Sequence, residues 1–292
     1  MPDFHELSEL RDIRELKDDP AAYAAELERR WTGLLSYRYI GRNHGSMNTG
    51  PADNTVTLRR DMRNAAGGLL VAPLSISAPE GDVGSDLVAV PNPVIHSCQI
   101  LDDARDVERI EVVASETLKV GARMGYSRSK IVDAADHDRV IAFTEGQGVR
   151  IGTPPEGLGK MPEDRLEIVD SPDLPPLWAA FGASRRDDGR WVLPELAVEL
   201  ASPDAALHIG PQHVVLETAA VDLAAGLAGT DLLQMRAWHV MFMARGKVGP
   251  FRVEGEAVRG AGATVGVRLT LHDEGNDDHA ITSASAVLHI VT

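Results

Sequence analysis

The sequence predicts an α+β protein in which two copies of one unit, each a long antiparallel sheet packed against a helix, follow one another. Three observations lead to this prediction: landmarks recur at a nearly constant offset, alternating strands dominate both halves, and one apolar helical segment precedes the long strands in each half. The 292 residues, 43% of them hydrophobic, can build one large core or two domain-sized ones.

A helical extension is expected to come first, over residues 1–49. Leucine and isoleucine recur at helical spacing from Leu7 to Leu16, and a second helical run, AAYAAELERRW, begins after Pro20. The opening decapeptide MPDFHELSEL is acidic and lacks a cationic segment followed by an apolar one, so we expect no secretory signal.

The repeat is clearest in a glycine-marked pair of segments. GARMG (Gly121–Gly125) recurs as GATVG (Gly262–Gly266), 141 residues later. The upstream stretch IEVVASETLKVG matches FRVEGEAVRGAG at the same shift. Landmarks in the same order at one offset predict a duplicated unit of roughly 140 residues.

The duplication divides the rest of the chain into three parts. The first copy spans residues 50–152 and the second spans residues 191–292. Each copy is expected to contain a short strand (around Val56 and Val198), a helix, and three or four long strands; TVGVRLTLH alternates apolar and polar residues cleanly. Residues 153–190 are rich in proline, aspartate and glycine, which predicts a connector, with a short helix at LWAAFG.

Composition and charge exclude several classes of function. With 29 basic and 44 acidic residues the net charge is −15, which argues against binding to nucleic acids or anionic membranes. The single cysteine, Cys98, cannot form an internal disulfide, which favours a reducing compartment. The longest apolar segment is interrupted by Glu217 and Asp222, so no membrane insertion is expected. We therefore expect a cytoplasmic protein.

Glu217 is an unusual feature of the second predicted helix. It is the only carboxylate in ALHIGPQHVVLETAAV, and Val214 and Ala220 share its helical face. A glutamate in apolar surroundings is costly unless it is paired, protonated or functional. Burial would raise its pKa toward the range that suits a general base.

The order of parts in each copy resembles the hotdog fold, a long curved sheet wrapped around one helix, and the tandem copies resemble a double hotdog. More narrowly, the sequence resembles acyl-CoA thioesterases of the phenylacetate-pathway type. Their motif is His-Gly-Gly at the start of the central helix, with an acidic residue nine positions after the His. In the second copy His208 and Glu217 have this spacing, Ile209 replaces the first glycine, and Gly210 keeps the second.

The first copy keeps the other half of the motif. Gly67 and Gly68 are present, but Ala66 takes the His position and Ser75 takes the acidic one. The resemblance therefore implies one composite active site, in which Glu217 faces backbone amides near Gly67 and Gly68. The mirror site would combine Ser75 with His208 and Gly210 and lacks the acid, so one competent site per chain is expected.

This arrangement implies the chemistry of thioester hydrolysis. Free N–H groups at a helix start can polarise a carbonyl, and a desolvated carboxylate can act as general base or nucleophile. Each residue also has a simpler interpretation. Glu217 could be paired with a buried Arg or hydroxyl group, and His208 could be a hydrogen-bonded residue at a helix start. Pro73 could make the first helix start later or kink it, which would move the glycine amides away from the carbonyl.

Cationic side chains are candidates for holding the phosphates of coenzyme A, because guanidinium groups bind phosphate in a bidentate manner. Arg59, Arg60 and Arg63 come just before the glycine pair, and Arg123 belongs to a second group. The first three could instead mark a solvated strand end.

The first functional hypothesis is hydrolysis of an acyl-CoA to free acid and CoA. The alternatives are a hotdog enoyl-CoA hydratase or hydroxyacyl dehydratase, and a non-catalytic protein that binds acyl thioesters. The sequence has no paired cysteines and no His-Glu-x-x-His, so no metal or cofactor is expected, and without a Gly-x-Ser-x-Gly motif a serine hydrolase is not expected either. Exposed sheet faces would allow association into homo-oligomers.

Overall fold

The computed structural model describes residues 10–41, 54–78, 90–151, 155 and 168–291. The predicted boundaries at residues 49–50 and 152–153 lie outside the described residues. The boundary at residues 190–191 falls at the start of a strand.

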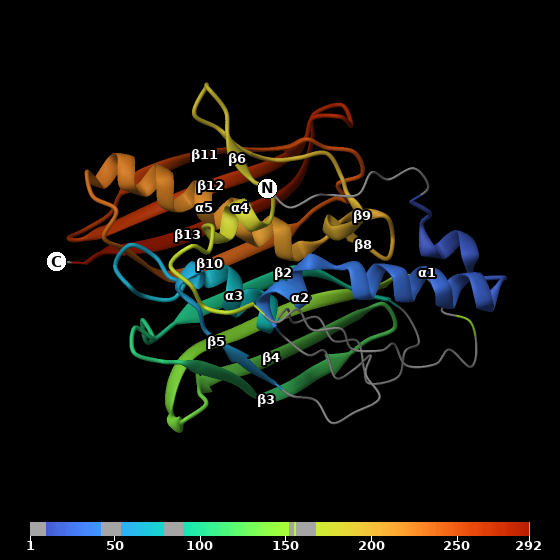
Figure 1. The fold of residues 1–292 in the computed structure, drawn as a ribbon, viewed down its shortest axis with the longest axis horizontal. Coiled ribbons are helices and arrows are strands. Elements are labelled where there is room, and N and C mark those ends of the chain that lie inside the picture. Colours follow the sequence, from blue (N-terminus) through green and yellow to red (C-terminus); the bar gives the residue numbers. More distant parts are fainter. Residues whose placement is uncertain (1–9, 42–53, 79–89, 152–154, 156–167, 292) are drawn as a thin grey trace.

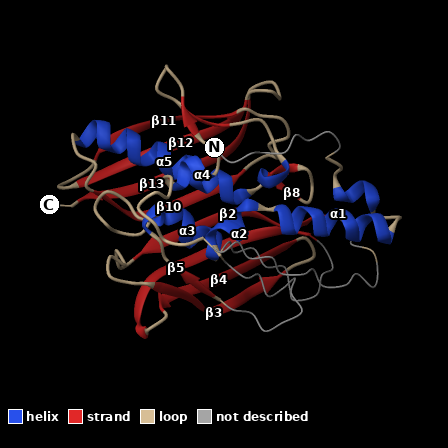
Figure 2. Cartoon of the chain, viewed as in Figure 1, coloured by secondary structure: helices blue, strands red, loops and turns tan. Residues whose placement is uncertain are grey.

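Helices form a minor part of the described chain and gather on one face of a large sheet (Figures 1 and 2). The α-helices are α1 (Pro20–Gly33), α2 (Leu35–Ile40), α3 (Val71–Ser77), α4 (Leu177–Ala180) and α5 (Ile209–Ala228). Short 3-10 helices are η1 (Ile13–Leu16), η2 (Arg60–Met62) and η3 (Val198–Leu200).

The strands come in two sets of four long ones with short strands around them. The first half has the short strand β1 (Thr55–Thr57). Its four long strands are β2 (Val90–Ile100), β3 (Arg109–Val120), β4 (Met124–Asp133) and β5 (Asp136–Ile151). Short strands follow as β6 (Ser184–Arg185), β7 (Trp191–Leu193), β8 (Ala201–Ser202) and β9 (Ala206–Leu207). The second long set is β10 (Leu233–Phe242), β11 (Phe251–Arg259), β12 (Thr264–Asp273) and β13 (His279–Ile290).

Eleven of these strands form one antiparallel sheet, in the order β1-β3-β4-β5-β2-β10-β13-β12-β11-β7-β6. Strands β2 and β10 pair at its centre, with Cys98 opposite Trp238; we call this pair the seam. Moving outward from the seam, each half places its first long strand, then its fourth, third and second. The two halves therefore have the same strand order, as two similar units would.

The alternation of side chains along the strands directs one face of the sheet toward the helices. In β12, Val265, Val267, Leu269 and Leu271 are buried while Arg268 between them is exposed. Burying such a row removes apolar surface from water on the helix side only, so the helices and this face share one core.

The two central helices differ in length although they start alike. Helix α5 has 20 residues and ends at Gly229 in the left-handed conformation, whereas α3 has 7 residues. Pro73 is the third residue of α3, inside the first turn, where no intrahelical N–H bond is required. Of the two effects expected of Pro73, the later start agrees with the structure, in which α3 begins at Val71, after the glycine pair.

The N-terminal extension packs against both halves of the chain, with α1 beside η3 and β8 and with α2 beside α3 and α5. Asp19 caps α1 by accepting a hydrogen bond from the Ala22 N–H group, and Pro20 begins that helix. The N–H group of buried Ile13 donates to the Pro203 carbonyl at 3.1 Å. Leu10 to Leu16, predicted as part of a helix, contain only the short η1 in the described part.

Candidate active site

Glu217 lies on α5 and reaches across the seam to the start of α3. Its side chain is buried, Oε1 accepts a hydrogen bond from the Val71 N–H group at 2.6 Å, and Oε2 accepts one from the Ala72 N–H group at 2.7 Å. The third residue of α3 is Pro73, which has no N–H group. The carboxylate therefore takes every donor that the first three residues of α3 offer.

Burial and these two hydrogen bonds act in opposite directions on the proton affinity of this carboxyl group. Burial raises the pKa of Glu217 to about 7, against the lowering effect of the bonds from Val71 and Ala72. The group is thus close to half ionised at neutral pH. Burial and, to a smaller extent, the nearby carboxyl group raise the pKa of the Cys98 thiol on β2, so this thiol stays protonated.

Gly67 and Gly68 lie in the turn before α3, and their N–H groups are already bonded within that turn. Gly67 donates to the Asn64 carbonyl at 2.9 Å, and Gly68 donates to the Asn64 side-chain oxygen at 3.0 Å. The expectation that this pair supplies free donors is therefore wrong for this structure. The donors that face Glu217 belong to Val71 and Ala72, a few residues further along the chain.

The backbone conformation and the packing explain why both positions are occupied by glycine. Gly67 has φ = +81°, in the left-handed region that favours glycine. Gly68 has no room for a side chain, because a Cβ atom there would overlap the side-chain amide of Gln234 on β10. The sequence analysis did not single out Gln234, since its importance depends on a contact between residues far apart in the chain.

His208 caps α5 instead of contacting Glu217. Its Nδ1 accepts a hydrogen bond from the Gly210 N–H group at 3.2 Å and lies 3.1 Å from the Ser36 hydroxyl of α2. Because Nδ1 accepts from a backbone donor, it is unprotonated and the Ser36 hydroxyl must donate to it. Burial lowers the pKa of His208 to about 3, so the ring is neutral. The nine positions to Glu217 correspond to about 13 Å of helix rise.

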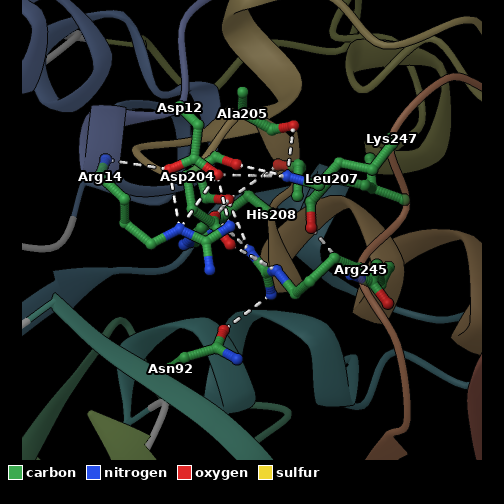
Figure 3. A network of polar contacts seen from close by, with 12 residues as sticks. Asp12, Arg14, Asn92, Asp204, Ala205, Leu207, His208, Arg245 and Lys247 are labelled. Atoms are coloured by element: carbon green, nitrogen blue, oxygen red, sulfur yellow. Dashed lines mark hydrogen bonds and ion pairs between the residues drawn. The ribbon is translucent and has the colours of Figure 1, made fainter. Parts of the chain in front are cut away.

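A network of ion pairs and hydrogen bonds surrounds His208 (Figure 3). Arg245 donates to both carboxylate oxygens of buried Asp204, to the Asn92 side chain at 2.7 Å, and to Ser202. Asn92 lies on β2 of the first half, so Arg245 also ties the two halves together. The role of His208 here is positional; a catalytic role stays a prediction.

The predicted mirror site is not assembled. Ser75 is buried on α3 and its hydroxyl lies 3.0 Å from Nε2 of His96 on β2. Gly210 packs so tightly on Ser36 that a Cβ atom would overlap its hydroxyl. Ser75 and Gly210 thus have separate partners.

The structure also corrects how the two helices correspond. Val71, Ala72 and Pro73 occupy the first three positions of α3, as Ile209, Gly210 and Pro211 do in α5. The fifth residue of α3 is Ser75 and the fifth of α5 is His213. Ser75 therefore corresponds to His213. The correspondence between Ser75 and Glu217 that the sequence predicts is wrong.

The predicted phosphate-binding arginines are engaged in structural contacts. Arg59 is buried, pairs with Asp61 at 3.0 Å, and stacks on the Tyr39 ring. Arg60 pairs with Asp170, and Arg63 donates to three backbone carbonyls. The first group is thus no free cationic patch. Arg123 is exposed in the turn between β3 and β4.

A cavity of about 810 Å³ lies on the other side of α5. Ala219, Asp222 and Leu223 line it together with the β6–β7 hairpin and β10 to β13, whereas Glu217 does not. Asp222 accepts a hydrogen bond from Trp191 Nε1 at 3.3 Å and pairs with Arg185 at 3.2 Å. Asp222 is thus a second acid on α5. In the sequence it stands out only because it interrupts the longest apolar segment.

Two further findings concern the described part of the chain. It holds no group of three or more His, Cys, Asp or Glu side chains placed to bind a metal ion. None of its helices is long and apolar enough to cross a membrane.

Comparison with known proteins shows the fold. No protein-family model matches the sequence, and no curated protein matches it. A TesB protein from Mycobacterium avium subsp. paratuberculosis is similar at a TM-score of 0.54 and 12% identity, covering 83% of this chain and 96% of that one. Acyl-CoA thioesterase II TesB2 from Mycobacterium marinum gives a TM-score of 0.54 at 13% identity, covering 82% and 93%.

A third solved structure names the architecture. A hot dog fold protein from Alicyclobacillus acidocaldarius gives a TM-score of 0.53 at 8% identity, covering 82% of this chain and 92% of that one. At such identities the likeness concerns the fold alone. The predicted α+β hotdog architecture is thereby confirmed, while the phenylacetate-pathway subtype stays a prediction.

Proposed function

We propose that the chain is a tandem pair of hotdog modules that form an intrachain pseudo-dimer across the seam. The identical strand order on both sides of β2–β10 supports this proposal. The matching starts of α3 and α5, each with a proline at its third position, support it further. The two modules would then share one site, as the halves of a hotdog dimer do.

We further propose that this site hydrolyses an acyl thioester, with acyl-CoA as the substrate. The acyl-CoA thioesterase II TesB2 from Mycobacterium marinum shares the fold. The observation that carries the proposal is the buried Glu217 carboxyl group, which lies across the seam against the amides of Val71 and Ala72. A base and a pair of backbone donors are thus already in contact.

The reaction begins when the thioester carbonyl oxygen replaces the carboxylate on the amides of Val71 and Ala72. These two N–H groups then polarise the carbonyl, and Glu217 is free to accept a proton from a water molecule. The water oxygen adds to the carbonyl carbon, and the negative charge on the resulting oxyanion is held by the same two amides. Collapse of this intermediate breaks the carbon–sulfur bond, and protonated Glu217 returns its proton to the thiolate. One water molecule is consumed, and a free acid and CoA are released.

The test is a panel of acyl-CoA substrates of different chain length, with thiol release followed by a thiol reagent. Wild type should release thiol, with a rate that rises through pH 7 as Glu217 ionises. Glu217→Gln should lose at least about 100-fold in kcat, at the lower end of what a general base contributes. Glu108→Gln, a change of an exposed glutamate just before β3 that lines neither candidate site, is the matched control and should leave the rate unchanged.

The variant Asp222→Asn tests which of the two acids on α5 takes part in the reaction. If this variant loses activity while Glu217→Gln keeps it, the reaction takes place at the 810 Å³ cavity and the role given to Glu217 is wrong. Retention of full activity by both variants would exclude both assignments.

Non-catalytic binding of an acyl thioester is the second candidate. It is favoured by the fact that both carboxylate oxygens of Glu217 are already engaged and that the carboxyl group does not line the cavity. Saturable binding of acyl-CoA without thiol release would support this alternative. Loss of enoyl-CoA absorbance without thiol release would instead indicate a hydratase.

A further inference from the structure

Gln234 on β10 connects the second half of the chain to the turn that precedes α3. Its side chain is fully buried. Its Oε1 accepts a hydrogen bond from the Asn64 side chain at 2.7 Å, and its Nε2 donates to the Leu69 carbonyl at 3.3 Å. Asn64 in turn accepts from the Gly68 N–H group at 3.0 Å. The glutamine amide therefore closes a ring of hydrogen bonds with the turn.

Contact with Gly68 fixes the turn from the other direction. A Cβ atom on Gly68 would overlap the Gln234 amide, so the backbone of the turn lies directly against it. The hydrogen bonds keep the turn from moving away from β10, and the steric contact keeps it from moving closer. These contacts together fix the distance between the turn and β10.

The turn leads directly into the donors that face Glu217. Leu69, whose carbonyl accepts the hydrogen bond from Gln234, comes two residues before Val71 and three before Ala72. Gln234 and Glu217 both belong to the second half, and both hold the same short segment of the first half. A displacement of the turn would move the two amides relative to the carboxylate.

The start of α5 offers a direct comparison. There the side chain of Gln212 donates to the Leu207 carbonyl at 3.0 Å, and its oxygen accepts from the Thr282 hydroxyl. Leu207 stands two residues before the first residue of α5, as Leu69 does before α3. The contact is the same in kind, but Gln212 belongs to α5 itself. Only α3 depends on a glutamine from the opposite half.

We infer that Gln234 is a positioning residue that sets the amides of Val71 and Ala72 against the Glu217 carboxyl group across the seam. The kinetic part of this inference rests on the proposed hydrolysis. The structural part does not, because the coupling between Gln234 and Glu217 can be measured on the folded protein alone.

The first experiment is a double-mutant cycle on unfolding, with Gln234→Met, Glu217→Gln and the double variant compared with wild type at pH 8. The two changes should be non-additive, since each acts on the same segment of the first half. The matched control is Gln212→Met, which removes the equivalent contact at α5 and should combine additively with Glu217→Gln. Additivity for Gln234→Met would overturn the inference.

The second experiment is the pH–rate profile with the best acyl-CoA substrate of the panel. Loosened amides hold the carboxylate less well, so Gln234→Met should move the acidic limb to higher pH by about one pH unit. We also expect kcat to fall about tenfold or more with KM nearly unchanged, because the amides act on charge that develops in the transition state. Burial raises the pKa of the nearby Cys98 thiol, so this group stays neutral over this range.

Gln212→Met should leave the position of this limb unchanged. A shift seen only for Gln234→Met then cannot result from a general loss of stability. If Gln234→Met does not fold, Gln234→Leu replaces it; this variant also removes the acceptor for Asn64 and the donor to Leu69, adds no ionisable group, and should shift the limb in the same direction. An unshifted limb in a folded Gln234 variant would refute the inference. Absence of turnover by wild type would refute the proposed hydrolysis instead, and the unfolding cycle would still decide the role of Gln234.

Discussion

Replacing Glu217 by glutamine should remove a large part of the pH dependence of stability. Because burial raises the pKa of Glu217 from its ordinary value of 4.5 to about 7, the folded protein binds more protons than the unfolded chain between these two pH values. The free energy of unfolding therefore contains a contribution that is fully present below pH 4.5. This contribution is lost as the pH rises through 7.

The magnitude follows from the two pKa values. A tenfold change in proton affinity corresponds to about 1.36 kcal/mol, so the total contribution is about 3 kcal/mol, of which about 2.5 kcal/mol is lost between pH 5 and pH 8.5. Glutamine cannot ionise, and like the protonated carboxyl group it has one oxygen that accepts from the amides of α3. We therefore expect Glu217→Gln and wild type to have similar stability at pH 5, and the variant to be more stable by about 2.5 kcal/mol at pH 8.5.

Urea denaturation followed by tryptophan fluorescence at pH 5, 7 and 8.5 measures this difference. Subtracting the wild-type value from that of the variant removes the contributions of all groups that the two proteins share. Glu256→Gln, at an exposed position, should follow the wild-type curve. A difference between Glu217→Gln and wild type that stays constant from pH 5 to pH 8.5 would refute the reasoning.

Three further predictions concern other parts of the structure. Gly68→Ala should destabilise the protein by about 2 kcal/mol in urea denaturation, because its methyl group would displace the Gln234 amide; an unchanged midpoint would contradict the packing described. Arg245→Met should cost about 3 kcal/mol or more, since it leaves the carboxylate of Asp204 buried without its main partner; a loss below 1 kcal/mol would show that Asp204 is solvated. Cys98 should not react with a thiol reagent in the native protein, because it is buried and burial raises the pKa of its thiol; rapid labelling without denaturant would indicate local opening at the seam.

The strands could be predicted where one face is buried and the other is not. Strand β12 covers the alternating segment TVGVRLTLH, whose pattern depends only on neighbours in the sequence. The prediction failed at Val198, which lies in η3, while the short strand of the second half that joins the large sheet is β7, a few residues earlier. A strand of three residues takes its structure from pairing with β11, which a local pattern does not contain.

The site shows the same division between local and distant causes. Glu217 could be identified because a carboxylate in an apolar helix is a local contradiction. Arg59 was misjudged because its partners, Asp61 and Tyr39, neutralise and cover it in the folded protein. Gln234 could not be found from spacing, since its acceptor is a backbone carbonyl in the other half of the chain.

In the part of the chain that the structure describes, one acid reaches across the seam, and this follows from helix length more than from the substitution at any one position. Glu217 is the ninth residue of α5, and this distance from the helix start lets its side chain reach the first turn of α3. Helix α3 ends at Ser77, its seventh residue, so it has no ninth helical position from which a side chain could reach the first turn of α5. That turn is covered instead by His208 and by Ser36 of the N-terminal extension. An acid introduced at Ser75 would lie in the fifth position, next to His96, and would not recreate the second site.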